Sequence, residues 1–147
     1  MKKKSKNAFE VFVPATSEKL PLPLYVAKIS AGFPSPAEDY IERKLDMNEY
    51  LIKNPSATFF VKVSGQSMIN AGIHDGDILV VDRSLDAADN RIVIAVINGE
   101  FTVKRLMKKN NKLFLVPENE NFNPIEINDT MDASIWGVVT YTIHKLR

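Results

Sequence analysis

Short apolar runs that recur along the second part of the chain predict a mostly β structure. From residue 58 onward, these runs are rich in β-branched residues and are separated by turn-forming residues. The clearest are Phe59 to Val63, Ile78 to Val81, Ile92 to Ile97 and Ile135 to Ile143. The run from Ile92 to Ile97 is the longest that is wholly apolar, and it is far too short to cross a bilayer.

Two pairs of turn residues predict β-hairpins. Asn98-Gly99 suits a type I′ turn, because that turn requires positive φ at both central positions. Asn110-Asn111 is flanked by segments that alternate as strands do, and it indicates a second hairpin. Together with the apolar runs, these turns predict a mostly β domain with a small helix.

The first hairpin turn determines which residues of its two strands face each other. A two-residue loop places Ala95 opposite Thr102 and Val93 opposite Lys104, with Thr102 and Leu106 on the lysine's own face. Burying an ammonium there is costly, and desolvation lowers the pKa of the amine. A neutral lysine amine is a competent general base. An edge-strand lysine that reaches solvent past its neighbours explains the same pattern equally simply.

The first part of the chain lacks periodicity and is rich in proline. Prolines at positions 14, 21, 23, 34 and 36 prevent a continuous helix or a central strand, so we expect an extended arm. Beyond it, Ser35 to Glu38 forms a capping box that favours a helix through Leu45. Ile41, Arg43 and Leu45 alternate, however, as in a short strand.

A second capping box follows, and it predicts a brief helix. Asp46 and Glu49 have the required spacing, and the helix is expected to run from Met47 to Lys53, where Pro55 ends it.

The composition excludes several kinds of chemistry. The 147-residue chain has no cysteine, which excludes disulfides, thiolate zinc sites and cysteine proteases. A formal net charge of +1 provides no bulk attraction to nucleic acid. Lysines at positions 2, 3, 4 and 6 are followed by a stretch that Glu10 interrupts and Pro14 ends, so no secretory signal is predicted. A cytoplasmic location is the default expectation.

Ser67 lies in a glycine-containing loop at the end of an apolar strand, in the segment Ser64-Gly65-Gln66-Ser67-Met68. Nucleophilic serines are commonly presented on such loops, where backbone N–H groups are free to hold an oxyanion. A plain turn has the same composition, so the segment alone does not separate the two interpretations.

The histidines and carboxylates offer little further chemistry. His74 is interpreted as part of a polar turn, and His144 lies in a terminal basic segment, so a classical serine triad is hard to build. Asp75, Asp77 and Asp82 lack the ligand spacing of a calcium loop. We therefore expect no metal site and no cofactor.

Taken together, these segments resemble the LexA/UmuD family of self-cleaving peptidases. The segment ending in Ser67-Met68 is similar to the family's nucleophile motif Ser-Gly-x-Ser-Met, and Phe101 to Leu106 resembles its lysine strand. Further matching segments are Gly76-Asp77 through Val80-Val81-Asp82, Pro117-Glu118-Asn119, and Ala31-Gly32 followed by Phe33-Pro34-Ser35-Pro36. The last of these resembles the self-cleavage site of the UmuD branch. The resemblance covers roughly Ser30 to Arg147.

This resemblance implies a peptidase domain of twisted, barrel-like sheets with a short helix over residues 32–147, preceded by an arm, residues 1–31, that is removed by self-cleavage. It also implies that Ser67 attacks the Ala31 carbonyl next to Gly32, while neutral Lys104 takes the hydroxyl proton. The backbone N–H groups of Ser67 and Met68 are the expected oxyanion hole. The family has a strand where the first capping box predicts a helix, and we expect the strand.

The resemblance implies partners as well. In this family an activated RecA–single-stranded DNA filament promotes cleavage, and the trimmed homodimer joins a Y-family, UmuC-type polymerase subunit for error-prone replication past lesions. No membrane contact and no direct sequence-specific DNA binding are expected. In one respect the chain departs from the UmuD branch, which usually has cysteine before the glycine at the cut. Here the residue is Ala31, as in LexA-type repressors.

Three alternative functions remain open. A LexA-like repressor would need a helix-turn-helix domain before the cut, where about thirty proline-broken residues stand. A non-catalytic module that binds a polymerase or RecA would carry Ser67 and Lys104 without using them. A signal-peptidase relative shares serine–lysine chemistry, but its usual membrane anchor is absent from the sequence.

Overall fold

The computed structural model describes residues 10–15, 19, 21–26 and 41–146, and the expected cleavage site Ala31-Gly32 lies outside them, as does the capping box at Ser35. The chain divides into two compact units. The larger comprises Met1–Pro14 and Asn54–Arg147, and the smaller comprises Ala15–Lys53. Within the described residues, no helix is both long enough and apolar enough to span a membrane.

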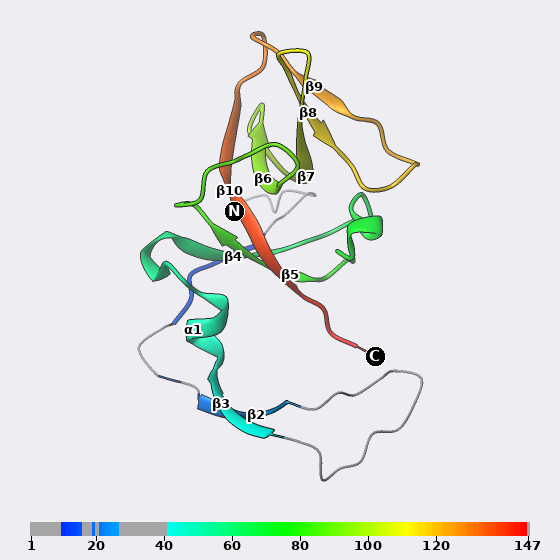
Figure 1. The fold of residues 1–147 in the computed structure, drawn as a ribbon. Helices are drawn as coiled ribbons and strands as arrows, with labels where there is room; N and C mark the ends of the chain where they lie inside the picture. The colour runs from blue at the N-terminus through cyan, green and yellow to red at the C-terminus, as the bar shows by residue number, and fades with distance from the viewer. Residues whose placement is uncertain (1–9, 16–18, 20, 27–40, 147) are drawn as a thin grey trace, which may run out of the picture. The chain divides into compact units, whose positions relative to one another are not determined.

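The larger unit is built on an eight-stranded sheet with the order β1-β4-β5-β10-β6-β7-β8-β9 (Figure 1). All of its neighbouring strands pair antiparallel. The strands are β1 (Glu10–Phe12), β4 (Thr58–Lys62), β5 (Ile78–Asp82), β6 (Ile92–Ile97), β7 (Glu100–Lys109), β8 (Lys112–Val116), β9 (Ile125–Ile127) and β10 (Ala133–Ile143). Short 3₁₀ helices occur at Pro55–Ala57 and Ile69–Ala71. The prediction of a mostly β fold is confirmed.

The long strand β10, orange to red in Figure 1, joins two halves of this sheet. Its first part pairs with β6 and its second part with β5, and Val138 has a partner in each, Val93 and Asp82. Gly137 lies at this junction, where an added Cβ would come within 2.7 Å of Cγ1 of Val81. A glycine is needed here because the neighbouring strand approaches too closely for any side chain.

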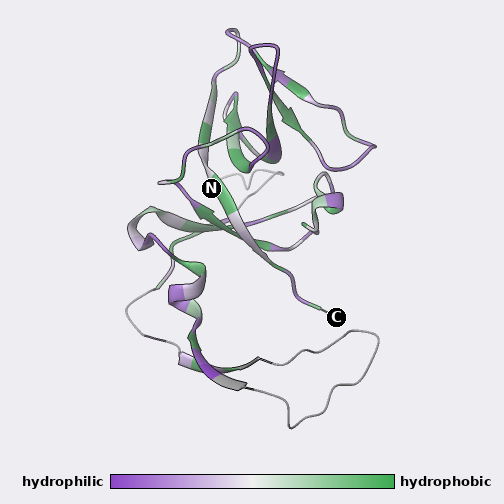
Figure 2. Cartoon of the chain, viewed as in Figure 1, coloured by the Kyte–Doolittle hydropathy of each residue, from purple (hydrophilic) through white to green (hydrophobic). Residues whose placement is uncertain are grey.

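Two clusters of buried apolar side chains stabilise the sheet. In Figure 2 the apolar colour follows β6 and parts of β10, whereas the turns between strands are polar. The first cluster contains Phe59, Val61, Val63, Met68, Ile73, Leu79, Val81, Ile94 and Val103. The second contains Val93, Ala95, Leu106, Leu115 and Val138. Neighbouring residues of one strand, such as Val93 and Ile94, fall in different clusters because successive side chains point to opposite faces.

Both predicted hairpins are present. Asn98 and Gly99 have φ values of 49° and 82°. Asn110 and Asn111, with φ values of 51° and 61°, connect β7 to β8. All four residues therefore have the positive φ that a type I′ turn requires.

The pairing of β6 with β7 follows the register expected from the first hairpin. Val93 lies opposite Lys104, and Ala95 lies opposite Thr102. The turn is also tied to the loop before β10, because the backbone N–H of Asn98 donates to the carbonyl of Asp132 at 2.8 Å.

The smaller unit contains a two-stranded sheet of β2 (Pro21–Val26) and β3 (Ile41–Asp46), followed by α1 (Met47–Leu51). The strand expected around Ile41 is therefore confirmed over the competing helix. Oδ1 of Asp46 accepts from the backbone N–H groups of Asn48 and Glu49 at 2.9 and 3.4 Å, which confirms the second cap. The helix ends at Leu51 rather than at Lys53.

The proline-rich first part of the chain forms short edge strands. β1 lies at the edge of the large sheet, where Val11 is paired with Val61 of β4. β2, which contains Pro21 and Pro23, pairs with a single neighbour. These positions agree with the expectation that proline excludes this part of the chain from a central strand.

Candidate active site

Ser67 and Lys104 meet in the structure, although 37 positions separate them in the chain. Nζ of Lys104 lies 3.0 Å from Oγ of Ser67. Ser67 belongs to the loop between β4 and the 3₁₀ helix at Ile69, and Lys104 belongs to β7. This separation is within the hydrogen-bonding reach that a general base needs to take a proton from its nucleophile.

The Lys104 amine is buried and has three polar neighbours. Lys104 is 9% exposed, and Nζ lies 2.7 Å from Oγ1 of Thr102 and 3.0 Å from the carbonyl oxygen of Val103, in addition to its contact with Ser67. No ion pair among the described residues involves Lys104, so its amine has no carboxylate partner there. Burial lowers the pKa of the Lys104 amine below its ordinary value.

These neighbours match what a neutral amine can do. A neutral amine has two N–H donors and one lone pair, so in that form Lys104 would donate to Thr102 and Val103 and accept from the Ser67 hydroxyl. The lone pair of a neutral Lys104 would then face the hydroxyl of Ser67. The edge-strand alternative, in which the lysine reaches solvent, is wrong because the amine is buried.

The turn before β5 holds one side of the serine loop. Oδ1 of Asp75 accepts a 2.7 Å hydrogen bond from the backbone N–H of Gly65, which has a φ of 93° that favours glycine. The backbone N–H of Gly76 donates to the carbonyl of Val63 at 2.8 Å. The backbone N–H of Val63 donates in turn to the carbonyl of Asp77 at 2.9 Å.

The segment Pro117-Glu118-Asn119 holds the other side of the serine loop. The Glu118 backbone N–H donates to the carbonyl of Ser67 at 2.9 Å, and Nδ2 of Asn119 donates to the carbonyl of Gln66 at 2.8 Å. The Glu118 side chain is paired with Nε of Arg105, the neighbour of Lys104. Sequence reasoning found this segment only as a resemblance and assigned it no role, because its partners are backbone carbonyls far away in the chain.

The two histidines lie with Asp77. His74 belongs to the polar turn that was predicted, whereas His144 contacts Asp77 at 2.6 Å between Nδ1 and Oδ1. No local sequence pattern indicated this contact, since it depends on the pairing of β10 with β5. Of the three carboxylates considered for metal binding, Asp75 is bonded to Gly65 and Asp82 to Asn54 and Ser84. Only Asp77 has histidine neighbours.

Comparison with known proteins identifies the family. Residues 23–140 match the Peptidase S24-like family. The chain is 50% identical over 123 residues to Protein MucA of Salmonella typhimurium, covering 83% of this chain and 84% of that protein. It is 44% identical over 135 residues to Protein ImpA of Shigella flexneri, covering 91% of each.

The chain is also similar to a repressor. It is 40% identical over 132 residues to the LexA repressor of Hahella chejuensis, covering 84% of this chain and 65% of the repressor. The resemblance inferred from the motifs is thus confirmed by a match over most of the chain. The chain belongs to the Peptidase S24-like family and, within it, to the UmuD-like proteins, which are self-cleaving peptidases accessory to an error-prone polymerase.

Proposed function

We propose that the chain cleaves its own Ala31-Gly32 bond, with Ser67 as nucleophile and Lys104 as general base. The observation that carries this proposal is the 3.0 Å contact between Nζ and Oγ in a buried setting that lowers the pKa of the lysine. A deprotonated amine in contact with a serine hydroxyl is the minimum that serine–lysine chemistry requires.

The reaction proceeds in two stages. Nζ of Lys104 takes the hydroxyl proton as Oγ of Ser67 attacks the carbonyl carbon of Ala31. The C–N bond to Gly32 then breaks, and the lysine returns the proton to the leaving amine. Water, deprotonated by the same lysine, hydrolyses the ester between Ser67 and Ala31 and regenerates the hydroxyl.

The oxyanion hole is proposed to consist of the backbone N–H groups of Ser67 and Met68. No described residue accepts a hydrogen bond from either group, so both are available to a developing negative charge. The Met68 side chain is 1% exposed and packs in the first apolar cluster, which anchors the backbone at this point.

The trimmed chain is proposed to act as a homodimer with a UmuC-type, Y-family polymerase subunit in the cytoplasm. Cleavage is proposed to follow DNA damage and to be promoted by a RecA–single-stranded DNA filament. The family and the relatives support a role beside an error-prone polymerase, and these particular partners extend that role.

A time course of self-cleavage tests the chemistry. Purified full chain is incubated at pH 7 to 10, with and without the RecA filament, and its intact mass is followed. We expect a fragment that begins at Gly32 and forms faster as the pH rises, because Lys104 loses its proton. Ser67→Ala and Lys104→Ala should each abolish this fragment.

Matched controls separate the chemistry from general damage to the fold. Ser134→Ala and Lys108→Ala change an exposed serine and an exposed lysine elsewhere on the same sheet, and they should cleave at the parental rate. An uncut parental chain under every condition, or equal cutting by Ser67→Ala, would overturn the proposal and leave a non-catalytic binding module.

A further inference from the structure

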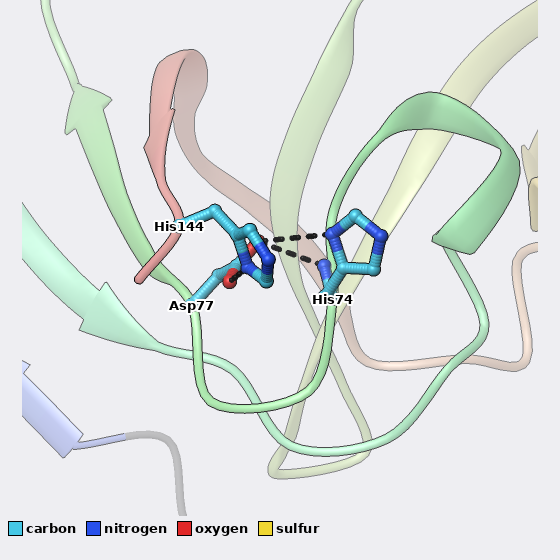
Figure 3. A group of neighbouring side chains, drawn as sticks. All are labelled: His74, Asp77 and His144. Atoms are coloured by element: carbon cyan, nitrogen blue, oxygen red, sulfur yellow. Dashed lines mark hydrogen bonds and ion pairs between the residues drawn. The ribbon is translucent and has the colours of Figure 1, made fainter. Parts of the chain in front are cut away.

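A second cluster of reactive side chains, His74, Asp77 and His144, lies at the end of the β5–β10 pair (Figure 3). Asp77 immediately precedes β5, and His144 immediately follows β10. Because Ile143 is paired with Ile78, the antiparallel register brings the next residue of β10 opposite Asp77. His74 reaches the same carboxylate from the preceding turn.

The three side chains are close enough to share one ligand. One potential ligand atom from each lies within 4.8 Å of the other two. Nδ1 of His144 is 2.6 Å from Oδ1 of Asp77, and Nδ1 of His74 is 3.7 Å from Oδ2. The two imidazole rings lie side by side, with centroids 4.4 Å apart and planes inclined by 35°.

Asp77 is held as a buried carboxylate. Its side chain is 2% exposed, and Oδ2 accepts from the His74 backbone N–H at 2.8 Å and from the Thr142 hydroxyl at 3.1 Å. Burial by itself raises the pKa of Asp77, but the hydrogen bonds from His74, His144 and Thr142 outweigh it and keep the pKa below its ordinary value. The group is therefore ionised at neutral pH.

One polar atom of the cluster lacks a partner. Nδ1 of His74 is buried and makes no hydrogen bond with any described residue, since Asp77 is too far away for one. An unsatisfied buried nitrogen is costly and calls for a ligand. The chain has two histidines and no cysteine. Both histidines lie at this one carboxylate.

We propose that His74, Asp77 and His144 bind one divalent transition-metal ion of the Zn²⁺ class. Two imidazole nitrogens and a carboxylate oxygen are ligands that Zn²⁺ prefers, and they leave a fourth position for water. The side chains of His74 and His144 are 44% and 40% exposed, which gives the ion and its water access from solvent. Ca²⁺ and Mg²⁺ are disfavoured because they require more oxygen ligands.

The geometry needs little adjustment to hold the ion. Ligands of a tetrahedral Zn²⁺ at about 2.0–2.2 Å lie roughly 3.3–3.6 Å from one another. The 3.7 Å separation of His74 runs to Oδ2 of Asp77 and the 2.6 Å separation of His144 runs to Oδ1. The three ligand atoms lie within 4.8 Å of one another, so shifts on the order of 1 Å bring them to these separations. To bind the ion through Nδ1, His144 has to adopt the tautomer that carries its proton on Nε2.

Bound metal would tie the end of β10 to the turn that supports the serine loop. That turn carries Asp75, whose side chain accepts a hydrogen bond from the backbone N–H of Gly65. Gly65 lies two residues before Ser67. The metal site is separate from the proposed peptidase chemistry, and its test does not depend on cleavage.

Metal titration of the untagged full chain carrying Ser67→Ala tests the site. Zn²⁺ binding is measured by competition with a chromophoric chelator, and Co²⁺ serves as a visible-absorbing substitute. We expect one ion per chain and a Co²⁺ spectrum of four-coordinate type. Tenfold excesses of Ca²⁺ and Mg²⁺ should not displace the bound Zn²⁺. His74→Gln and His144→Gln should each weaken binding at least about tenfold, since even residues behind a metal ligand cost about 10- to 100-fold.

Asp86→Asn, which removes an exposed carboxylate outside the cluster, should bind as the parent does. Parental affinity in the double histidine variant would show adventitious binding and overturn the proposal, as would the absence of stoichiometric Zn²⁺ binding. X-ray absorption of the Zn²⁺-loaded parent provides a measurement that needs no substitution. Two imidazole ligands are expected, and a spectrum without imidazole scattering would contradict the site.

Discussion

At the residue scale, Lys104 differs from the other lysines of the described residues in its surroundings. The others are all exposed, whereas Lys104 is buried next to Val93 on a strand. An amine in such a position is expensive to protonate, so a larger fraction of it is deprotonated and able to accept a proton at moderate pH. Burial of Lys104 would therefore favour the proposed chemistry while lowering the stability of the fold.

This cost predicts a pH-dependent effect of Lys104→Met on stability in the uncleavable Ser67→Ala background. Below the lowered pKa of Lys104 the folded chain bears the full cost of a buried ammonium, so methionine has its largest relative advantage. As the pH rises through that pKa toward the unfolded value of about 10.4, the folded state releases its proton first and the advantage shrinks.

Urea unfolding of the two variants at pH 6.5, 8 and 9.5 measures this difference. The advantage of methionine is expected to be largest at pH 6.5 and smallest at pH 9.5. A difference in unfolding free energy that stays constant with pH would show that the amine has the same pKa in the folded and unfolded chains.

At the element scale, the serine loop is held by hydrogen bonds from two other segments. The turn before β5 supports it at Gly65, and the segment after β8 supports it at Gln66 and Ser67. A nucleophile on a loop needs such support, because small displacements of reacting atoms lower rates strongly.

Asn119→Ala is expected to slow self-cleavage by about 10- to 100-fold while leaving the fold intact, because the loop loses the hydrogen bond at Gln66. Cleavage rates are followed by intact mass, and folding by circular dichroism. Asn121→Ala is the matched control. The hydrogen bond of Asn121 to Asn119 is donated by its backbone N–H, which the substitution keeps. Equal rates for the two variants would show that the Asn119 side chain does not position the nucleophile.

At the scale of the whole larger unit, the proposed nucleophile and base come from different halves of the sheet. Ser67 follows β4 and precedes β5, whereas Lys104 lies on β7, and β10 joins the two halves. The relative position of these halves therefore decides whether the two groups meet. At Gly137 of β10, an added Cβ would lie 2.7 Å from Cγ1 of Val81 in β5.

Gly137→Ala is expected to lower the free energy of unfolding by about 1–3 kcal/mol, because the new Cβ overlaps Val81 at 2.7 Å and the Asp82 carbonyl oxygen at 3.1 Å. Chemical denaturation measures the loss. In a Val81→Ala background the same substitution should cost less, since the overlapping methyl group is gone. Strictly additive losses would mean that the two positions do not interact.

Local patterns in the sequence were sufficient for much of the sheet. The Asn98-Gly99 turn determines the pairing of Val93 with Lys104, because a two-residue loop allows one register. Asp46 determines the start of α1 through its own side chain. In both cases the interacting residues are neighbours in the chain or are joined by one tight turn. The Ala31-Gly32 cleavage site, in contrast, remains a prediction from resemblance.

The tertiary structure alone decided how distant segments meet. The contact of Ser67 with Lys104, the support of Gln66 by Asn119, and the placement of His144 beside Asp77 all require pairing between segments far apart in the chain. Alternation of apolar and polar residues specifies the faces of a strand but not its partner, so no local pattern contained these contacts. The sequence by itself thus determined the two hairpins, most strands of the larger sheet and the candidate residues, whereas the long-range pairing through β10 determined which of those residues lie together.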